Sequence, residues 1–114
     1  METKQRPVPA PVKAGGPLQR IRLEIIFSQA LEEDFQLACK DMQIGNRFTK
    51  FESVMGAGTS DPKLGDAVWP QLNMMYVIYC DKEEAKKLCA VVRKLRKKFL
   101  TEGIACFMSR ATEL

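Results

Sequence analysis

The sequence predicts an α+β fold in which a four-stranded antiparallel sheet carries two helices on one face. Apolar residues recur with the period of a strand in four segments and with the period of a helix in two. These segments follow one another in the order βαββαβ. Only one connection between them, residues 56–70, is much longer than the few residues that usually join neighbouring strands. The whole chain, at 114 residues, has the size of one domain.

The N-terminal segment differs from the rest in composition. Residues 1–19 hold four of the six prolines and a Gly-Gly pair. Such a segment buries too little apolar surface to offset the entropy lost on ordering. We therefore expect a flexible tail over residues 1–19 and a folded domain over residues 20–114.

The first two elements are a strand and a helix. Residues 20–28 alternate between apolar and polar side chains, which is typical of a strand. The period changes in residues 29–42, where one helical stripe contains Leu31, Phe35, Ala38 and Met42. Acidic residues near the start of this helix suit the positive end of its dipole. Ser28 is the expected N-cap.

A second strand is predicted over residues 46–55. Strict alternation would place Phe48 and Val54 on one face and Phe51 and Met55 on the other. This strand leads directly into the long connection.

The third predicted strand, residues 72–80, is apolar on both faces. Leu72, Met74, Tyr76 and Ile78 would lie on one side, and the other side would carry Met75, Val77 and Tyr79. A strand with two apolar faces is expected at the centre of a sheet that is covered on both sides.

The last two elements are a long helix and a fourth strand. Residues 81–103 carry an apolar helical stripe, with Asp81 as N-cap and Glu84 at the capping-box position. Gly103 is a suitable stop for the helix. Residues 104–111 then form the last predicted strand.

Two right-handed crossovers in this order produce the ferredoxin-like arrangement, with the first and third strands in the middle. Both helices then cover the same face of the sheet. The other face would expose the second apolar side of the third strand, and exposed apolar patches of this kind mark interfaces. We therefore expect a symmetric homo-oligomer.

Composition excludes several classes of function. The chain has no histidine, so the usual zinc sites and any histidine-based catalysis are excluded. The cysteines form no Cys-x-x-Cys pair and lie within apolar patterns, as buried reduced thiols do; they are Cys39, Cys80, Cys89 and Cys106. The carboxylates cluster at helix starts, where capping and dipole effects explain them. A non-enzymatic protein is expected, and the absence of an apolar signal or spanning segment favours the cytoplasm.

The start of the long connection resembles a known family. Gly56-Ala57-Gly58-Thr59-Ser60 is similar to the Gly-x-Gly-x-Gln opening of the T-loop in PII-like signalling proteins, the nitrogen-regulatory type. In that family the T-loop also joins the second and third strands. Thr101-Glu102-Gly103-Ile104 resembles the family's nucleotide-binding turn between the second helix and the fourth strand. Ser60 replaces the usual glutamine, and Ile104 stands near the position of a phosphate-binding lysine, which indicates a divergent member.

The resemblance implies a homotrimer that binds a small anionic ligand, such as an adenine nucleotide or bicarbonate, in clefts between subunits. A cluster of five cations within residues 93–98 ends beside the Gly103 turn; it could be a solvated helix surface, or it could bind a phosphate there. Arg110 is the only candidate for the family's C-terminal basic pair. The predicted ligand-binding residues are Gly56, Gly58, Thr59, Ser60, Lys97, Lys98, Gly103 and Arg110.

The long connection also offers a surface for a protein partner, as the T-loop does in the family. Trp69 is the only tryptophan in the chain. It could fold back onto the core at the start of the third strand, or it could anchor a partner, since tryptophan is enriched in binding hot spots. Lys63 and Asp66 could be solvated or could contact the same partner.

RNA binding is the alternative function. Ferredoxin-like domains include RNA-recognition modules, and the basic second helix could contact phosphate groups. The third strand, however, lacks the aromatic signature of those modules. Tyr76 and Tyr79 also point to opposite faces, which disfavours a base-stacking platform.

Overall fold

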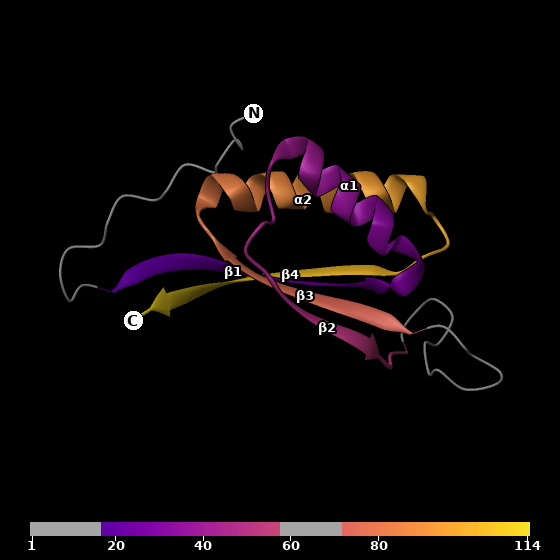
Figure 1. The fold of residues 1–114 in the computed structure, drawn as a ribbon, viewed down its shortest axis with the longest axis horizontal. Helices are drawn as coiled ribbons and strands as arrows, with labels where there is room; N and C mark the ends of the chain where they lie inside the picture. The colour runs from indigo at the N-terminus through magenta and orange to yellow at the C-terminus, as the bar shows by residue number, and fades with distance from the viewer. Residues whose placement is uncertain (1–16, 58–71) are drawn as a thin grey trace, which may run out of the picture.

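The computed structural model describes residues 17–57 and 72–114 (Figure 1). Its elements in chain order are β1 (Leu18–Ser28), the short 3-10 helix η1 (Gln29–Leu31), α1 (Glu32–Met42), β2 (Thr49–Val54), β3 (Asn73–Cys80), α2 (Lys82–Lys98) and β4 (Ile104–Glu113). The predicted order βαββαβ is confirmed.

The strands form one antiparallel sheet in the order β2-β3-β1-β4, so β1 and β3 occupy the middle as predicted. Both α-helices lie on the same side of this sheet (Figure 1). The fold is therefore the predicted ferredoxin-like α+β arrangement. β1 begins at Leu18, two residues before the predicted start, and pairs there with Glu113 of β4.

The core lies between the helices and the sheet. From β1 it contains Leu23, Ile25 and Phe27, which alternate along the strand and are fully buried. The rings of Phe27, Phe35 and Tyr76 pack against one another with centroids 4.9–5.7 Å apart. Burial of such side chains contributes about 1.5–3 kcal/mol each. These contacts set the position of α1 over β1 and β3.

The helix starts follow their predicted caps. The Ser28 hydroxyl accepts the backbone N–H of Ala30, and the Asp81 carboxylate accepts that of Glu84. Ser28 caps η1 rather than α1, because a 3-10 turn precedes the α-helix.

Met42 was predicted to lie on the buried stripe of the first helix, and this is wrong. Its side chain is 41% exposed, and Cys39 is buried instead. The reason is that α1 ends at Met42 and Gln43 adopts a left-handed φ of 57°, which turns the chain. Ile44, after this turn, is buried against the core.

The strict alternation predicted for the second strand fails at one residue. Phe51 pairs with Met75 and Val54 pairs with Asn73, so Phe51 and Val54 lie on the same face. A bulge between them, with Ser53 at a φ of 58°, adds the residue that changes the register. Val54 therefore faces away from the helices, not toward them.

Candidate functional site

One end of the sheet carries both flanks of the long connection between β2 and β3. Val54 of β2 pairs with Asn73, which pairs in turn with Ser28 of β1. Next to Ser28, Phe27 pairs with Ile104 at the start of β4. We call this the loop end of the sheet. The base of the connection thus lies at one edge of the loop end, and the turn between α2 and β4 lies at the other.

Gly56 packs closely against β3. A Cβ atom placed on Gly56 would lie 2.5 Å from Nδ2 of Asn73, a distance that real Cβ atoms do not reach. A larger residue at position 56 would therefore force the Asn73 side chain to shift at the base of the connection. The other predicted residues of the connection, which lie outside the described residues, are Gly58, Thr59, Ser60, Lys63, Asp66 and Trp69.

The predicted basic residues near Gly103 lie together at the other edge. Lys98 Nζ lies 3.6 Å from Asp34 Oδ1 of α1 and 5.4 Å from the centre of the Phe99 ring. Lys97 is exposed at the end of α2 and forms no ion pair with any acid in the described ranges. The structure thus brings Lys97, Lys98 and Gly103 to the loop end.

Arg96 fixes the turn that contains Gly103. Its guanidinium donates through Nε and Nη2 to the carbonyl oxygen of Ile104, at 3.0 and 2.8 Å. A fork of two charged hydrogen bonds holds this carbonyl more firmly than one neutral bond could. The prediction gave Arg96 no such role, because a hydrogen bond to a backbone carbonyl leaves no signal in the sequence.

Arg110 lies elsewhere in the same chain. It pairs with Ile21 on β1, six residues after Ile104. At about 3.3 Å per residue, it is on the order of 20 Å from the loop end. A single chain therefore does not bring Arg110 together with Gly56 or Gly103.

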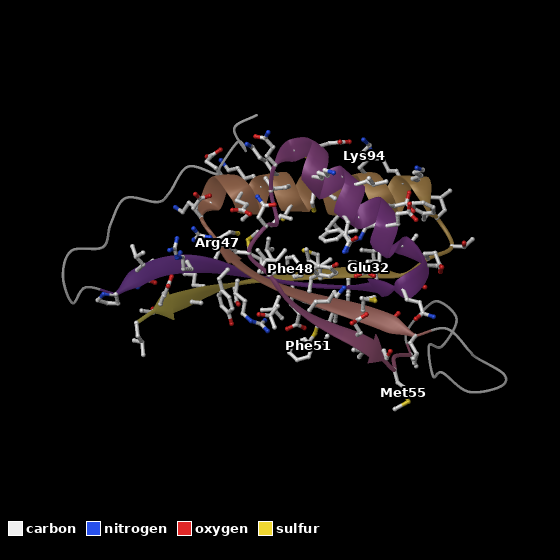
Figure 2. The ribbon with its side chains drawn as sticks, in the orientation of Figure 1. Glu32, Arg47, Phe48, Phe51, Met55 and Lys94 are labelled. Carbon is white, nitrogen blue, oxygen red and sulfur yellow. The ribbon has the colours of Figure 1, made fainter. Side chains whose placement is uncertain are left out.

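A polar cluster that sequence reasoning missed joins α1 to β2 and β3. Oε2 of Glu32 accepts hydrogen bonds from the hydroxyl of Tyr76 and from Nζ of Lys50, both at 2.8 Å. Gln36 donates to the same hydroxyl at 3.0 Å. Because β2 leads to Gly56, this cluster anchors the strand on which the long connection begins. Figure 2 shows Glu32 between α1 and the sheet.

The cluster changes the acidity of its members. Burial alone would raise the pKa of Glu32, but the hydrogen bonds from Lys50 and Tyr76 outweigh burial and lower the pKa. Burial, together with the hydrogen bond to Glu32, raises the pKa of Tyr76 to about 12. The ionised carboxylate and the neutral phenol are therefore both favoured by the fold.

Glu84 makes a second connection that was not predicted. It is a buried carboxylate on α2, and its Oε2 accepts the backbone N–H of Gly45 at 2.8 Å. Gly45 has a φ of 68°, which favours glycine. Glu84, which the sequence places at the capping-box position of α2, thus contacts the segment that joins α1 to β2.

The sheet face away from the helices, here called the open face, exposes large apolar side chains. Phe107 is 61% exposed, Tyr79 is 50% exposed, and both rings lie on this face by register. Phe51 and Met55 also point away from the helices (Figure 2). The predicted exposed apolar surface is thus present. Tyr76, in contrast, is buried under the helices, so the predicted opposite orientation of the two tyrosines is confirmed.

The described part of the chain contains no helix that is both long and apolar enough to cross a membrane. All four cysteines lie in the described ranges and are outside any disulfide, and Cys39 and Cys80 are buried. Burial raises the pKa of the Cys39 thiol to about 12, with a smaller contribution from Glu84.

The βαββαβ order, the sheet order and the position of the long connection define the fold of the PII-like proteins. No family model matches the sequence, and no curated protein matches it. The resemblance appears in solved structures, and the predicted likeness to PII-like proteins is confirmed at the level of the fold.

One similar structure is CPII from Thiomonas intermedia K12 bound to ADP and bicarbonate, with a TM-score of 0.69 and 15% identity over 85% of this chain and 90% of that one. A second CPII structure, bound to ADP, AMP and bicarbonate, has a TM-score of 0.66 and 14% identity over 85% and 94% of the two chains. A PII-like signalling protein from Thermus thermophilus has a TM-score of 0.61 and 12% identity over 86% and 92%.

Proposed function

We propose that this chain is a divergent, non-enzymatic PII-like signalling protein that binds a small anionic ligand between the subunits of a homotrimer. The fold carries this proposal, because it matches CPII bound to ADP and bicarbonate over most of both chains. The candidate ligands are therefore an adenine nucleotide and bicarbonate.

The open face supports self-association. It presents large apolar side chains from β2, β3 and β4, including Phe51, Tyr79 and Phe107. A patch of this kind on a small domain is unfavourable in water and is typical of an interface. A second and third copy of the chain are the proposed occupants.

The two edges of the loop end support a ligand site between copies. Gly56 lies at the β2 edge, and Lys97 and Gly103 lie at the β4 edge. A single chain keeps these edges three strands apart, about 14 Å at the usual strand spacing. A ring joins unlike surfaces of neighbouring subunits, so it would bring one chain's glycine-containing base beside the next chain's cations. Arg110 would then reach this ligand site from a neighbouring subunit.

The long connection is the proposed contact with a protein target. Ligand bound at its base would favour one arrangement of the connection and so change the surface that the target meets. Lys63, Asp66 and Trp69 stay the predicted contacts. The cytoplasm stays the predicted compartment.

Isothermal titration of the full chain with ADP, AMP and bicarbonate tests this function. We expect saturable nucleotide binding that weakens about tenfold in Lys97→Gln, since a charged hydrogen bond to phosphate is lost. The matched control is Lys94→Gln, which removes a cation from the outer surface of the same helix (Figure 2). It should leave the affinity unchanged.

A parallel titration with single-stranded RNA separates the two candidate functions. The proposal would be contradicted if none of the three small ligands binds and if the chain instead binds RNA in a salt-sensitive way that both lysine variants weaken equally. That result would favour a basic helix surface that contacts nucleic acid without a defined ligand site.

A further inference from the structure

Two of the four cysteines contact each other between the helical layer and the sheet. Cys89 is on α2 and Cys106 is on β4, and their side chains share a hydrogen bond. Both pack against the edge of the core and are partly exposed, whereas Cys39 and Cys80 are buried. The two neighbouring thiols are therefore open to small molecules from solvent.

Strand register and helix periodicity bring the pair together. Cys106 pairs with Ile25 of β1, which is fully buried, so the Cys106 side chain lies on the helical side of the sheet. On α2, Cys89 precedes Arg96 by two helical turns and shares its side of the helix. Arg96 donates to the carbonyl oxygen of Ile104, two residues before Cys106. This side of α2 therefore faces β4, and the fold itself places the two thiols in contact.

The surroundings of the pair favour a reaction that starts at Cys89. Burial raises the pKa of the Cys106 thiol to about 11, with smaller contributions from the charge and the hydrogen bond of Cys89. Cys106 therefore stays protonated at neutral pH and donates its S–H to Cys89, which leaves the Cys89 sulfur as the nucleophile. The guanidiniums of Arg93 and Arg96 act on Cys106 in the opposite direction, so they place positive charge near the two sulfurs. Positive charge of this kind suits a reactive thiolate.

We propose that Cys89 and Cys106 form a reactive dithiol site, whose substrate is a peroxide and whose product is a disulfide between α2 and β4. The Cys89 thiolate attacks one oxygen of hydrogen peroxide, which breaks the O–O bond, leaves a sulfenic acid on Cys89 and releases hydroxide. The Cys106 thiol then attacks the sulfenic sulfur, forms the S–S bond and releases water. In total, two thiols are oxidised and one peroxide is reduced to two waters. Two equivalents of a small thiol reverse the oxidation by exchange.

The disulfide joins two elements that meet at the predicted ligand site. The chain between the two cysteines contains Lys97, Lys98 and the Gly103 turn. Oxidation closes this segment into a ring and limits how far the end of α2 can move from β4. Formation of the disulfide does not require a bound ligand, so its test is independent of the proposed function.

The test is treatment of the reduced full-length protein with hydrogen peroxide, followed by blocking of free thiols, tryptic digestion and mass spectrometry. We expect a disulfide that joins the peptides Leu88–Arg93 and Phe99–Arg110, while Cys39 and Cys80 react with the blocking reagent only after unfolding. The linked fraction should not change when the protein is diluted, because the bond forms within one chain. Dithiothreitol should remove the link.

Single substitutions and a second reagent complete the test. Cys89→Ser and Cys106→Ser should each abolish the linked peptides, and Cys39→Ala, the matched control, should keep them. Phenylarsine oxide bridges neighbouring thiols without oxidation, so it should bind the wild-type protein and protect the pair from peroxide. The inference is overturned if peroxide produces only separate sulfinic acids, a bond between two chains, or a link to Cys39 or Cys80.

Discussion

The hydroxyl of Tyr76 donates to the carboxylate of Glu32 across 2.8 Å, and Lys50 donates to the same oxygen. The three residues come from a central strand, a helix and an edge strand. Their hydrogen bonds fix β2 to the helical layer immediately before the chain enters the long connection. The geometry at the base of that connection therefore depends on a cluster inside the same subunit.

Alkaline pH should weaken the fold through Tyr76. Folding raises the pKa of this phenol from its ordinary value of 10.0 to about 12. The stabilisation is therefore fully present below pH 10 and is lost as the pH rises toward 12. We expect the free energy of unfolding to fall by on the order of 1–2 kcal/mol over this range.

Tyr79→Phe makes this loss easy to follow, since Tyr76 is then the only tyrosine. Its ultraviolet titration should have a midpoint near 12, and denaturant unfolding should weaken over the same interval. A midpoint at 10 would contradict both the burial of this phenol and its hydrogen bond to Glu32.

Gly56→Ala should disturb the base of the long connection. The added Cβ would lie 2.5 Å from Nδ2 of Asn73, so either the Asn73 side chain or the start of the connection must move. Asn73→Ala removes the obstructing amide, so the double variant should recover the wild-type unfolding free energy. Thermal unfolding of the four proteins in this cycle measures the coupling. Additive effects would contradict the contact.

Glu84→Gln should destabilise the protein by about 1–3 kcal/mol, because the partly buried N–H of Gly45 loses its charged acceptor. Glu83→Gln is the control. Glu83 is an exposed residue on the same helix, and its Oε1 lies 3.6 Å from Nζ of Lys86. Such surface pairs contribute about 0–1 kcal/mol. Denaturant unfolding compares the two variants, and equal effects would rule out the special role of Glu84.

Phe107→Glu should dissociate the proposed oligomer, because it places a charge in the apolar open face. Leu37→Glu is the matched control, since Leu37 is 54% exposed on α1 and lies on the helical side of the molecule. Size-exclusion chromatography with light scattering gives the mass of each variant. A mass that falls equally in both variants, or in neither, would contradict an interface on the open face.

The fold was largely predictable because its signals are local. Alternation and helical stripes located all six main elements, and the caps at Ser28 and Asp81 marked helix starts. The face of Val54 was missed because the bulge at Ser53 uses a left-handed residue that is not glycine. A serine in a β-branched, aromatic segment does not indicate a bulge.

The candidate site was predicted less completely, for a physical reason. Lys97, Lys98 and Gly103 are neighbours in sequence, so their proximity followed from the helix and its end. Glu32 was assigned to the helix dipole, whereas its partners Lys50 and Tyr76 lie 18 and 44 residues away. Contacts at that separation depend on strand register and helix placement, which single-sequence patterns do not specify.

Sedimentation velocity with ADP present, followed at 260 and 280 nm, tests the central claim most directly, because it reports subunit assembly and ligand binding in one run. The chain has a mass of 12.9 kDa, so a homotrimer has about three times that mass. We predict that ADP sediments with the trimeric species and that Lys97→Gln reduces the bound fraction. A 12.9 kDa monomer, or a trimer that sediments without ADP at millimolar concentration, would contradict the account.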